Sequence, residues 1–285
     1  MNTDKSKCGI AILFGHIEYD GRVQRILNSL VTNYDITLIC IGMSNSIGSN
    51  FGYNVIRLDH HYKYILHIKL LIKVLKEVKS IRPDFVIAHD FFTSFTGYLA
   101  KLFHRVKLIV DSHELIVPHA LGHFDVREKI WYLLDKFALK RADLVICTNI
   151  QRAEIMRWFY RLKSRPLVIN NMETFNETHL SIKEKTGIKK KVVYQGDIAK
   201  ERGIFKILHA IKNTVHKIEI DIYGNGPDVD ELKNEIIPNI QKYVVIRYHG
   251  SISRKDLHQL LKEYDIGLIS YPYESLNSNF CASNK

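Results

Sequence analysis

The sequence is poor in the features that mark membrane-spanning, exported and disulfide-stapled proteins. No run approaches about 18 uninterrupted apolar residues, and residues 1–16 lead directly into a strand-like run without a cleavable signal pattern. The four cysteines, at positions 8, 40, 147 and 281, are widely scattered. We therefore expect a cytoplasmic protein with neither a disulfide framework nor a metal site.

Composition is that of an ordinary globular protein, but the charge is uneven. The 285 residues are 46% hydrophobic and 25% charged, with a net charge of +11. Up to residue 170 there are 24 basic against 15 acidic residues, and the remainder has 17 against 15. The basic first half indicates an anionic partner, such as a phosphorylated substrate or an acidic membrane surface, although a well-solvated face would look the same. Nucleic-acid binding has only this charge in its favour, because no recognised module is present.

Short apolar runs alternate with helical patterns along most of the chain. This alternation predicts βαβ units, and hence α/β domains built on parallel sheets. In the first half the expected strands are 8–14, 36–42, 53–58, 84–90, 107–113 and 143–149, and the expected helices are 20–31, 62–80, 95–103 and 128–140. In the second half the expected strands are 191–197, 218–226, 244–250 and 265–271, and the expected helices are 204–213, 229–237 and 254–264.

Two Rossmann-like domains follow from this pattern. We expect the first to span residues 1–170, a polar linker to occupy 171–190, and the second to span 191–285. Four strands are fewer than the five or six usual in such a sheet, so the second domain is expected to be incomplete.

Polar residues follow several predicted strands, where ligands bind in open parallel sheets. Gly15 and Gly21 bracket the first strand-to-helix turn, and their spacing is not that of a dinucleotide-binding motif. A ligand role and a generic turn both remain open. His113 follows a strongly apolar strand between Asp111 and Glu114, which could fix its tautomer for hydrogen bonding to a substrate. A structural histidine is the alternative, as it is for His89-Asp90.

The second half carries one arginine at a predicted helix start and one glycine-rich turn. Arg202 stands where a guanidinium and the helix N-terminus could act on the same diphosphate, although a solvated surface arginine fits equally well. The turn from Gly224 to Pro227 permits a sharp strand-to-helix connection. By itself that turn is a weak signal.

Taken in order, these segments resemble glycosyltransferase family four, of GT-B fold, and particularly the bacterial enzymes of surface-polysaccharide assembly. The segments that carry the resemblance in the first half are D-G-R-V at 20–23, D-S-H-E-L at 111–115 and R-A-D-L-V-I at 141–146. In the second half they are Y-Q-G-D at 194–197, E-R-G-I at 201–204, Y-G-N-G-P at 223–227, Y-D-I-G-L at 264–268 and the stretch 271–285.

The resemblance implies a hexosyltransferase-like enzyme that uses a nucleotide sugar and needs no cofactor. The second domain would hold the donor and the first a lipid-linked or polysaccharide acceptor, with retention of anomeric configuration and no bound metal. Positive side chains would then stabilise the leaving diphosphate. The implied catalytic residues are His113 and Arg202, and the implied donor-binding residues are Gly15, His16, Arg202, Gly224, Glu274, Asn277, Asn279 and Lys285.

The sequence departs from the family pattern at two places. Asp197 stands where many relatives carry a second basic residue. The glutamate that resembling enzymes use on the nucleotide ribose would lie about three residues beyond Lys285, so we expect a C-terminally truncated chain. The alternative function is therefore an inactive glycosyltransferase-like chain or a binding module without catalysis.

The predicted helix at 62–80 has a basic face. Lys69, Lys73 and Lys76 share one side at spacings i, i+4 and i+7, next to a broad apolar surface. One hypothesis is that this helix lies on the cytoplasmic face of the inner membrane and helps to recruit a lipid-linked acceptor. A covering helix on a Rossmann sheet would show much the same pattern.

Overall fold

The computed structural model describes residues 7–42, 51–59, 63–117, 125–172, 190–212, 218–240, 244–252, 254–272 and 276–281. The chain divides into two compact units, residues 1–172 and 173–285. Each unit is an α/β structure with its own parallel sheet, as the sequence predicts. Most of the predicted linker lies outside the described residues.

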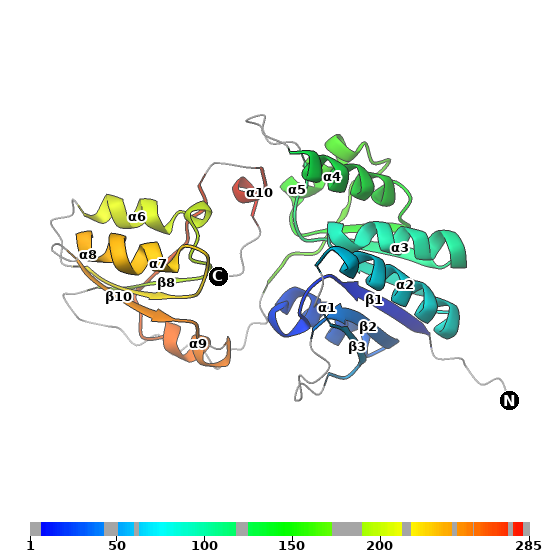
Figure 1. The fold of residues 1–285 in the computed structure, drawn as a ribbon, viewed down its shortest axis with the longest axis horizontal. Helices are drawn as coiled ribbons and strands as arrows, with labels where there is room; N and C mark the ends of the chain where they lie inside the picture. Colours follow the sequence, from blue (N-terminus) through cyan, green and yellow to red (C-terminus); the bar gives the residue numbers. More distant parts are fainter. Residues whose placement is uncertain are drawn as a thin grey trace. The chain divides into compact units, whose positions relative to one another are not determined.

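Unit 1 is built on a seven-stranded sheet in the order β3-β2-β1-β4-β5-β6-β7 (Figure 1). Every pairing between neighbouring strands is parallel. The strands are β1 (Cys8–Leu13), β2 (Asp35–Ile41), β3 (Asn54–Leu58), β4 (Phe85–His89), β5 (Lys107–Ser112), β6 (Leu144–Cys147) and β7 (Leu167–Val168). The first six match the predicted strands, and β7 was not predicted.

Helices cover both faces of this sheet because its central strands are apolar on both sides. Alternate residues of β1 show the division: Ala11 and Leu13 pack with the helix α1, whereas Ile10 and Ile12 pack with α2 and α3. The helices of unit 1 are α1 (Gly21–Leu30), α2 (Lys63–Ile81), α3 (Phe91–His104), α4 (Val126–Leu139) and α5 (Ile150–Tyr160), with the 3-10 turn η1 at Ile17–Tyr19. The sequence analysis missed α5.

Unit 2 carries a four-stranded parallel sheet in the order β10-β9-β8-β11. The strands β8 (Lys191–Gln195), β9 (Glu219–Tyr223), β10 (Val245–Gly250) and β11 (Ile266–Leu268) match the four predicted ones. In the described part of the unit β11 lies at an edge of the sheet, and Ile266 on it is 45% exposed.

One apolar core lies on one face of that sheet. Ile220 and Ile222 of β9 pack there against Leu208 of α6 and Leu232 of the following helical segment. The helical elements of unit 2 are η3 (Lys200–Arg202), α6 (Ile204–Ile211), the consecutive α7 (Val229–Glu231), η4 (Leu232–Ile236) and α8 (Ile237–Ile240), then α9 (Arg254–Leu261) and α10 (Leu276–Asn279). No helix in the described ranges of the chain is both long enough and apolar enough to cross a membrane.

Candidate functional site

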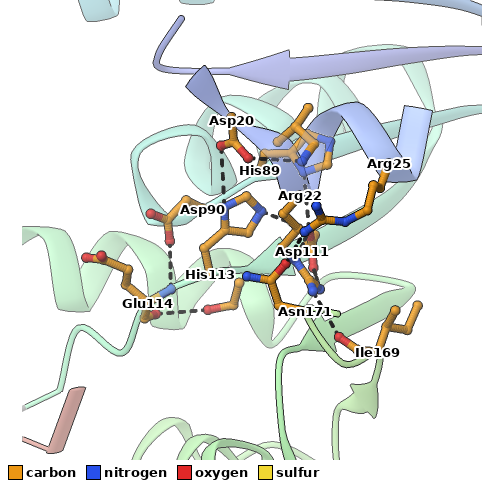
Figure 2. A network of polar contacts seen from close by, with 12 residues as sticks. Asp20, Arg22, Arg25, His89, Asp90, Asp111, His113, Glu114, Ile169 and Asn171 are labelled. Carbon is orange, nitrogen blue, oxygen red and sulfur yellow. Dashed lines mark hydrogen bonds and ion pairs between the residues drawn. The ribbon is translucent and has the colours of Figure 1, made fainter. Parts of the chain in front are cut away.

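The carboxyl ends of β1, β4 and β5 are neighbours in unit 1 and bring together a network of ionisable side chains (Figure 2). Asp20 comes from the turn between β1 and α1, His89 and Asp90 from the end of β4, and Asp111 and His113 from the end of β5. This is the edge at which open parallel sheets bind ligands.

Asp111 is the centre of the network and Arg22 is its main partner. The carboxylate is fully buried, and Arg22 bonds both of its oxygens, with Nε at 3.0 Å and a terminal nitrogen at 2.5 Å. The other terminal nitrogen of Arg22 donates to the carbonyl of Ile169 at 2.9 Å. Asp20 accepts a hydrogen bond from the amide of Val23 and so fixes the start of α1. Arg22, in the first turn of this helix, reaches Asp111 at the end of β5. The D-G-R-V segment therefore ties the first turn of α1 to β5.

Two histidines bond the same carboxylate oxygen of Asp111. Nδ1 of His89 lies 3.3 Å from Oδ2, and Nε2 of His113 lies 2.9 Å from it. Burial alone would raise the pKa of Asp111, but the hydrogen bonds from His113, His89 and Arg22 hold that pKa well below its usual range.

The two histidines differ in protonation state. Burial lowers the pKa of His89, and Asp111 offsets this only in part, so His89 is neutral at pH 7 with a buried Nε2 that has no hydrogen-bond partner. Burial also acts to lower the pKa of His113, but the bond to Asp111 and the charges of Asp111, Asp90 and Asp20 outweigh it and raise that pKa. At pH values between the two pKa values, His113 is therefore protonated and His89 is neutral.

His113 is also positioned through its backbone and its second ring nitrogen. Its Nδ1 lies 3.8 Å from Asp20, and its carbonyl oxygen accepts a hydrogen bond from Arg152 of α5. The side chain is 16% exposed, so one edge of the ring remains accessible. Of the two flanking carboxylates in the sequence, Asp111 fixes the ring, whereas Glu114 joins the network through its backbone amide.

Asp90 adopts a backbone conformation that favours glycine. Its φ is 67° and its ψ 169°, a combination that costs on the order of 1–3 kcal/mol in other residues and is typical of functional sites. The side chain does not cap α3 but accepts a long hydrogen bond, 3.3 Å, from the amide of Glu114. Burial raises the pKa of Asp90 to about 6. This backbone conformation thus places the Asp90 carboxyl beside His113 and not at the start of α3.

His89, Asp111 and His113 offer three potential metal-ligand atoms that lie within 4.8 Å of one another. Arg22 already bonds both oxygens of Asp111, and a guanidinium stays protonated in proteins. A metal ion bound there would face that fixed positive charge at close range. The chemistry of the cluster therefore fits a hydrogen-bonded ion network better than a cation site.

In unit 2 the glycine-containing turns after β8 and β9 and the segment after β11 crowd together. A Cβ on Gly224 would overlap the carbonyl oxygen of Gly196, and one on Gly203, whose φ is 74°, would overlap the side chain of Ser270. Only glycine permits these approaches. The Gly-x-Gly-Pro turn thus packs directly on the turn that follows β8.

Arg202 lies at this crowded edge and is half-exposed. Its Nε lies 3.8 Å from the carboxylate of Asp197, and its guanidinium is 5.6 Å from the ring centre of Tyr271. The acid that departs from the family pattern is therefore the neighbour of the arginine predicted to bind diphosphate. At this distance and exposure Asp197 only partly offsets the charge of Arg202.

Of the other predicted site residues, Gly15 and His16 lie in the connection between β1 and α1 that also carries Asp20. Gly15 accepts from the amide of Ile41 through its carbonyl, and His16 immediately precedes η1. Asn277 and Asn279 belong to α10, whereas Glu274 and Lys285 lie outside the described residues. On α2, Lys69 and Lys76 are exposed, and Lys73 pairs with Glu77 at 2.8 Å.

Sequence reasoning missed Arg22 as part of the site. The available signal was the place of Arg22 in the D-G-R-V segment. That segment supported the family resemblance, but the sequence alone assigned no contact to Arg22. The role depends on a contact across 89 residues of sequence, between Arg22 and Asp111.

Comparison with known proteins gives a family and a set of similar folds. Residues 22–172 match the family model described as Glycosyltransferase Family 4. No curated protein matches the chain in sequence.

Three of the similar solved structures have TM-scores of 0.63 to 0.70. Sucrose-phosphate synthase from Thermosynechococcus elongatus is 15% identical with a TM-score of 0.70, over 95% of this chain and 77% of that one. The HepE protein of Anabaena, in complex with UDP and glucose, is 15% identical with a TM-score of 0.69, over 94% and 75%. The lipopolysaccharide outer core galactosyltransferase WaaB is 13% identical with a TM-score of 0.63, over 93% and 74%. At these identities the similarity shows the fold.

Proposed function

Because more than half of the chain matches its model, this protein belongs to glycosyltransferase family 4, and we infer that it moves a hexose from a nucleotide sugar to a lipid-linked or polysaccharide acceptor. The observation that carries this proposal is the pair of parallel sheets, each with a polar cluster at the carboxyl ends of its strands. One cluster contains Arg202 beside glycine-rich turns, and the other is an ion network around His113.

The donor diphosphate fits the glycine-rich edge of unit 2. The close approach of Gly224 to Gly196 leaves no side chain of their own at this edge, and Arg202 adds a permanent charge there. The similar HepE structures contain UDP, glucose or UDP-glucose, which supports a nucleotide-sugar donor. Further donor contacts are proposed for Gly15, His16, Glu274, Asn277, Asn279 and Lys285.

The proposed chemistry needs no cofactor and no metal ion, and it retains the anomeric configuration. As the glycosidic bond to the diphosphate breaks, negative charge grows on the leaving oxygen, and Arg202 stabilises it. His113 carries a positive charge held by Asp111 and Asp20, so it presents a cationic edge to the donor sugar. Asp111 and Arg22 position that ring without touching the substrate.

The proposed acceptor belongs to the cell envelope and lies at the cytoplasmic face of the membrane. Support comes from the basic unit 1 and from the similarity to WaaB, which acts on the lipopolysaccharide outer core. Lys69, Lys73 and Lys76 of α2 are the proposed contacts to that anionic surface.

A direct test measures nucleotide release by the purified chain from a panel of UDP-, GDP- and ADP-sugars, with a cell-envelope lipid fraction as acceptor. Release that depends on both donor and acceptor is the expected result. Isothermal titration with the matching nucleoside diphosphates accompanies it. Failure of every nucleotide to bind would overturn the proposal, and binding without transfer would support the alternative of a non-catalytic binding module.

A further inference from the structure

The outward side of α4 is an apolar stripe. Four large side chains are strongly exposed there, with Val126 at 70%, Ile130 at 52%, Leu133 at 61% and Phe137 at 40%. Their spacings of four, three and four residues keep them on one side of the helix. Exposed apolar residues are ordinary when scattered singly, but a continuous stripe along a helix marks an interaction surface.

Basic residues border the stripe on both sides, and no acid within the helix faces outward. The remaining exposed residues between positions 126 and 141 are Arg127, Lys129, Lys140 and Arg141. The two acids of α4 lie elsewhere: Asp135 is buried on the inner side, and Glu128 closes a capping box with Asp125. Every exposed residue in this stretch is therefore either apolar or positively charged.

Most of the stripe is distinct from the side by which α4 packs on the rest of unit 1, but Phe137 contacts Tyr98 of α3 at a ring-centre distance of 5.0 Å and lies 3.5 Å from the guanidinium of Arg141. That inner side carries Ala138 and Leu139, which are buried, and Tyr132, whose hydroxyl donates to the carbonyl of Phe159 in α5. Trp131 packs against Phe92 of α3 at a ring-centre distance of 5.0 Å. Folding of unit 1 thus uses the inner side and part of Phe137, and it leaves Val126, Ile130 and Leu133 exposed.

The neighbouring helix α2 repeats the pattern. Ile65, Ile68 and Ile72 are 48–58% exposed, and Lys69 and Lys76 lie between and beside them. Helices α2, α3 and α4 lie side by side on the same part of unit 1 (Figure 1). The apolar and basic character therefore extends over one broad face rather than one helix.

We propose that Val126, Ile130 and Leu133, the exposed part of the α4 stripe, insert into the interfacial region of an anionic lipid bilayer, with the flanking lysines and arginines on the lipid phosphates. Amphipathic helices with a purely basic polar border bind membranes in this way. A second copy of the chain fits less well, because a twofold contact would place like charges of the same helix opposite each other. This inference extends the proposed membrane contact from the α2 lysines to α4. It rests on the proposed function in one respect only, namely that a lipid-linked acceptor lies at a membrane.

The test is co-sedimentation of the full chain with vesicles of phosphatidylcholine alone or with 30% phosphatidylglycerol, on the order of the anionic content that a basic segment senses. We expect binding to the anionic vesicles that weakens as salt rises. Removing three charges with Arg127→Gln, Lys129→Gln and Lys140→Gln should reduce the partition constant on the order of a hundredfold. Ile130→Gln with Leu133→Gln should reduce it at least tenfold, because about 0.8 kcal/mol is lost per buried CH₂.

Two matched variants decide whether the effect belongs to α4. Lys190→Gln, Lys233→Gln and Lys262→Gln remove the same charge from exposed positions of unit 2 and should leave vesicle binding nearly unchanged. Equal loss in this control, or wild-type binding by the α4 variants, would overturn the inference. Ile68→Gln with Ile72→Gln reports the share of α2, and complete loss there with none at α4 would also overturn it.

Three further measurements keep the outcomes distinct. Circular dichroism confirms that each variant is folded. Sedimentation velocity without lipid would assign the stripe to a second copy if the wild type dimerised and the α4 variants did not. Nucleotide titration in solution separates the two proposals. A wild-type chain that binds nucleotide but not anionic vesicles counts against this inference alone, and one that binds the vesicles but no nucleotide counts against the proposed function alone.

Discussion

At the scale of single residues, one carboxylate sets two different protonation states. Asp111 bonds Arg22, His89 and His113, yet burial lowers the pKa of His89 while three nearby carboxylates raise the pKa of His113. If both rings were equally accessible to water, His89 and His113 would have similar pKa values. The network therefore holds a proton more readily on the partly exposed ring of His113 than on the buried ring of His89.

His113 makes the stability of unit 1 depend on pH on the alkaline side. Its folded pKa is raised above 6.5, so its contribution is complete below that pH and is lost as pH rises through the folded pKa. We expect His113→Gln to lose roughly 1.5–3 kcal/mol at pH 6, the range for a charged hydrogen bond, and less at pH 9. Urea unfolding followed by tryptophan fluorescence measures this, because Trp131 and Trp158 both belong to unit 1.

The exposed His209 in unit 2 is the matched control for that experiment. His209→Gln should leave the fluorescence-detected transition unchanged at both pH values. If His113→Gln destabilised unit 1 equally at pH 6 and pH 9, the ring would be packing as a neutral group and the assigned charge would be wrong.

Arg202 is the residue on which the proposed chemistry depends most. Replacing it with alanine should lower kcat about a hundredfold, since loss of one charge-stabilising donor costs roughly 3 kcal/mol in the transition state. Lys200→Ala is the control, because Lys200 is two residues away and pairs with Glu231. Steady-state kinetics with the preferred donor give both values. Equal kinetics for Arg202→Ala and the wild type would remove Arg202 from the site.

The sequence identified the strand ends that carry the candidate site but not the contacts within it. His113 and Asp111 were found because they follow an apolar strand. Arg22 and Asp20 were not assigned roles, because their contacts to Asp111 and His113 bridge distant segments. The left-handed conformation of Asp90 was equally hidden, since it results from tertiary structure and not from local preference.

At the scale of elements, the fold follows from hydrophobic periodicity wherever an element is buried. All ten predicted strands are present, because each contains apolar residues, either in a run or alternating with polar ones, next to turn signals. The strand β7 has only two residues, and α5 has a weakly segregated pattern of charged and apolar residues, so neither gives a clear period. The segment α7–η4–α8 contains a π-helical turn, which no sequence period indicates.

Helix α4 carries a buried acid on its inner side, which should weaken its attachment to α3 and α5. Asp135 is 1% exposed, and both of its oxygens lack a hydrogen-bond partner. The nearby hydroxyls of Ser94 and Tyr160 donate instead to the carbonyls of Phe91 and Ile116. Burial consequently raises the pKa of Asp135 to about 7. In the folded protein the carboxyl is therefore protonated at acidic pH.

Asp135→Asn should therefore stabilise unit 1 at alkaline pH. An acid with a raised folded pKa takes up a proton on folding, so stability falls as pH rises from about 4 to about 7 and the penalty is complete above that. We expect a gain on the order of 1–4 kcal/mol at pH 8 and almost none at pH 4, measured by urea unfolding. The pH 4 value is the internal control, and an equal gain at both would point to packing instead of ionisation.

At the scale of the whole molecule, the two units differ in charge and in optical probes. The basic excess lies almost entirely in unit 1, which also contains both tryptophans, whereas unit 2 has none. Unit 1 thus has the electrostatic character for an anionic surface, and unit 2 has the crowded glycine turns and Arg202 for a diphosphate. This division allows ligand binding to be assigned to one unit in the intact chain.

If the nucleotide binds mainly to unit 2, it should stabilise that unit alone. A ligand at a hundred times its Kd adds about 2.7 kcal/mol to the unit that binds it, which corresponds to a Tm shift of roughly 10 °C for about a hundred residues. With UDP present, we expect the unfolding transition of unit 2 seen by far-ultraviolet circular dichroism to rise, while the tryptophan transition of unit 1 stays in place. Uridine, which lacks the diphosphate, and Arg202→Ala with UDP should both give smaller shifts, because each removes one partner of the same ionic contact. A shift confined to the tryptophan transition would place the nucleotide in unit 1, and the donor role of the glycine-rich edge would then be wrong.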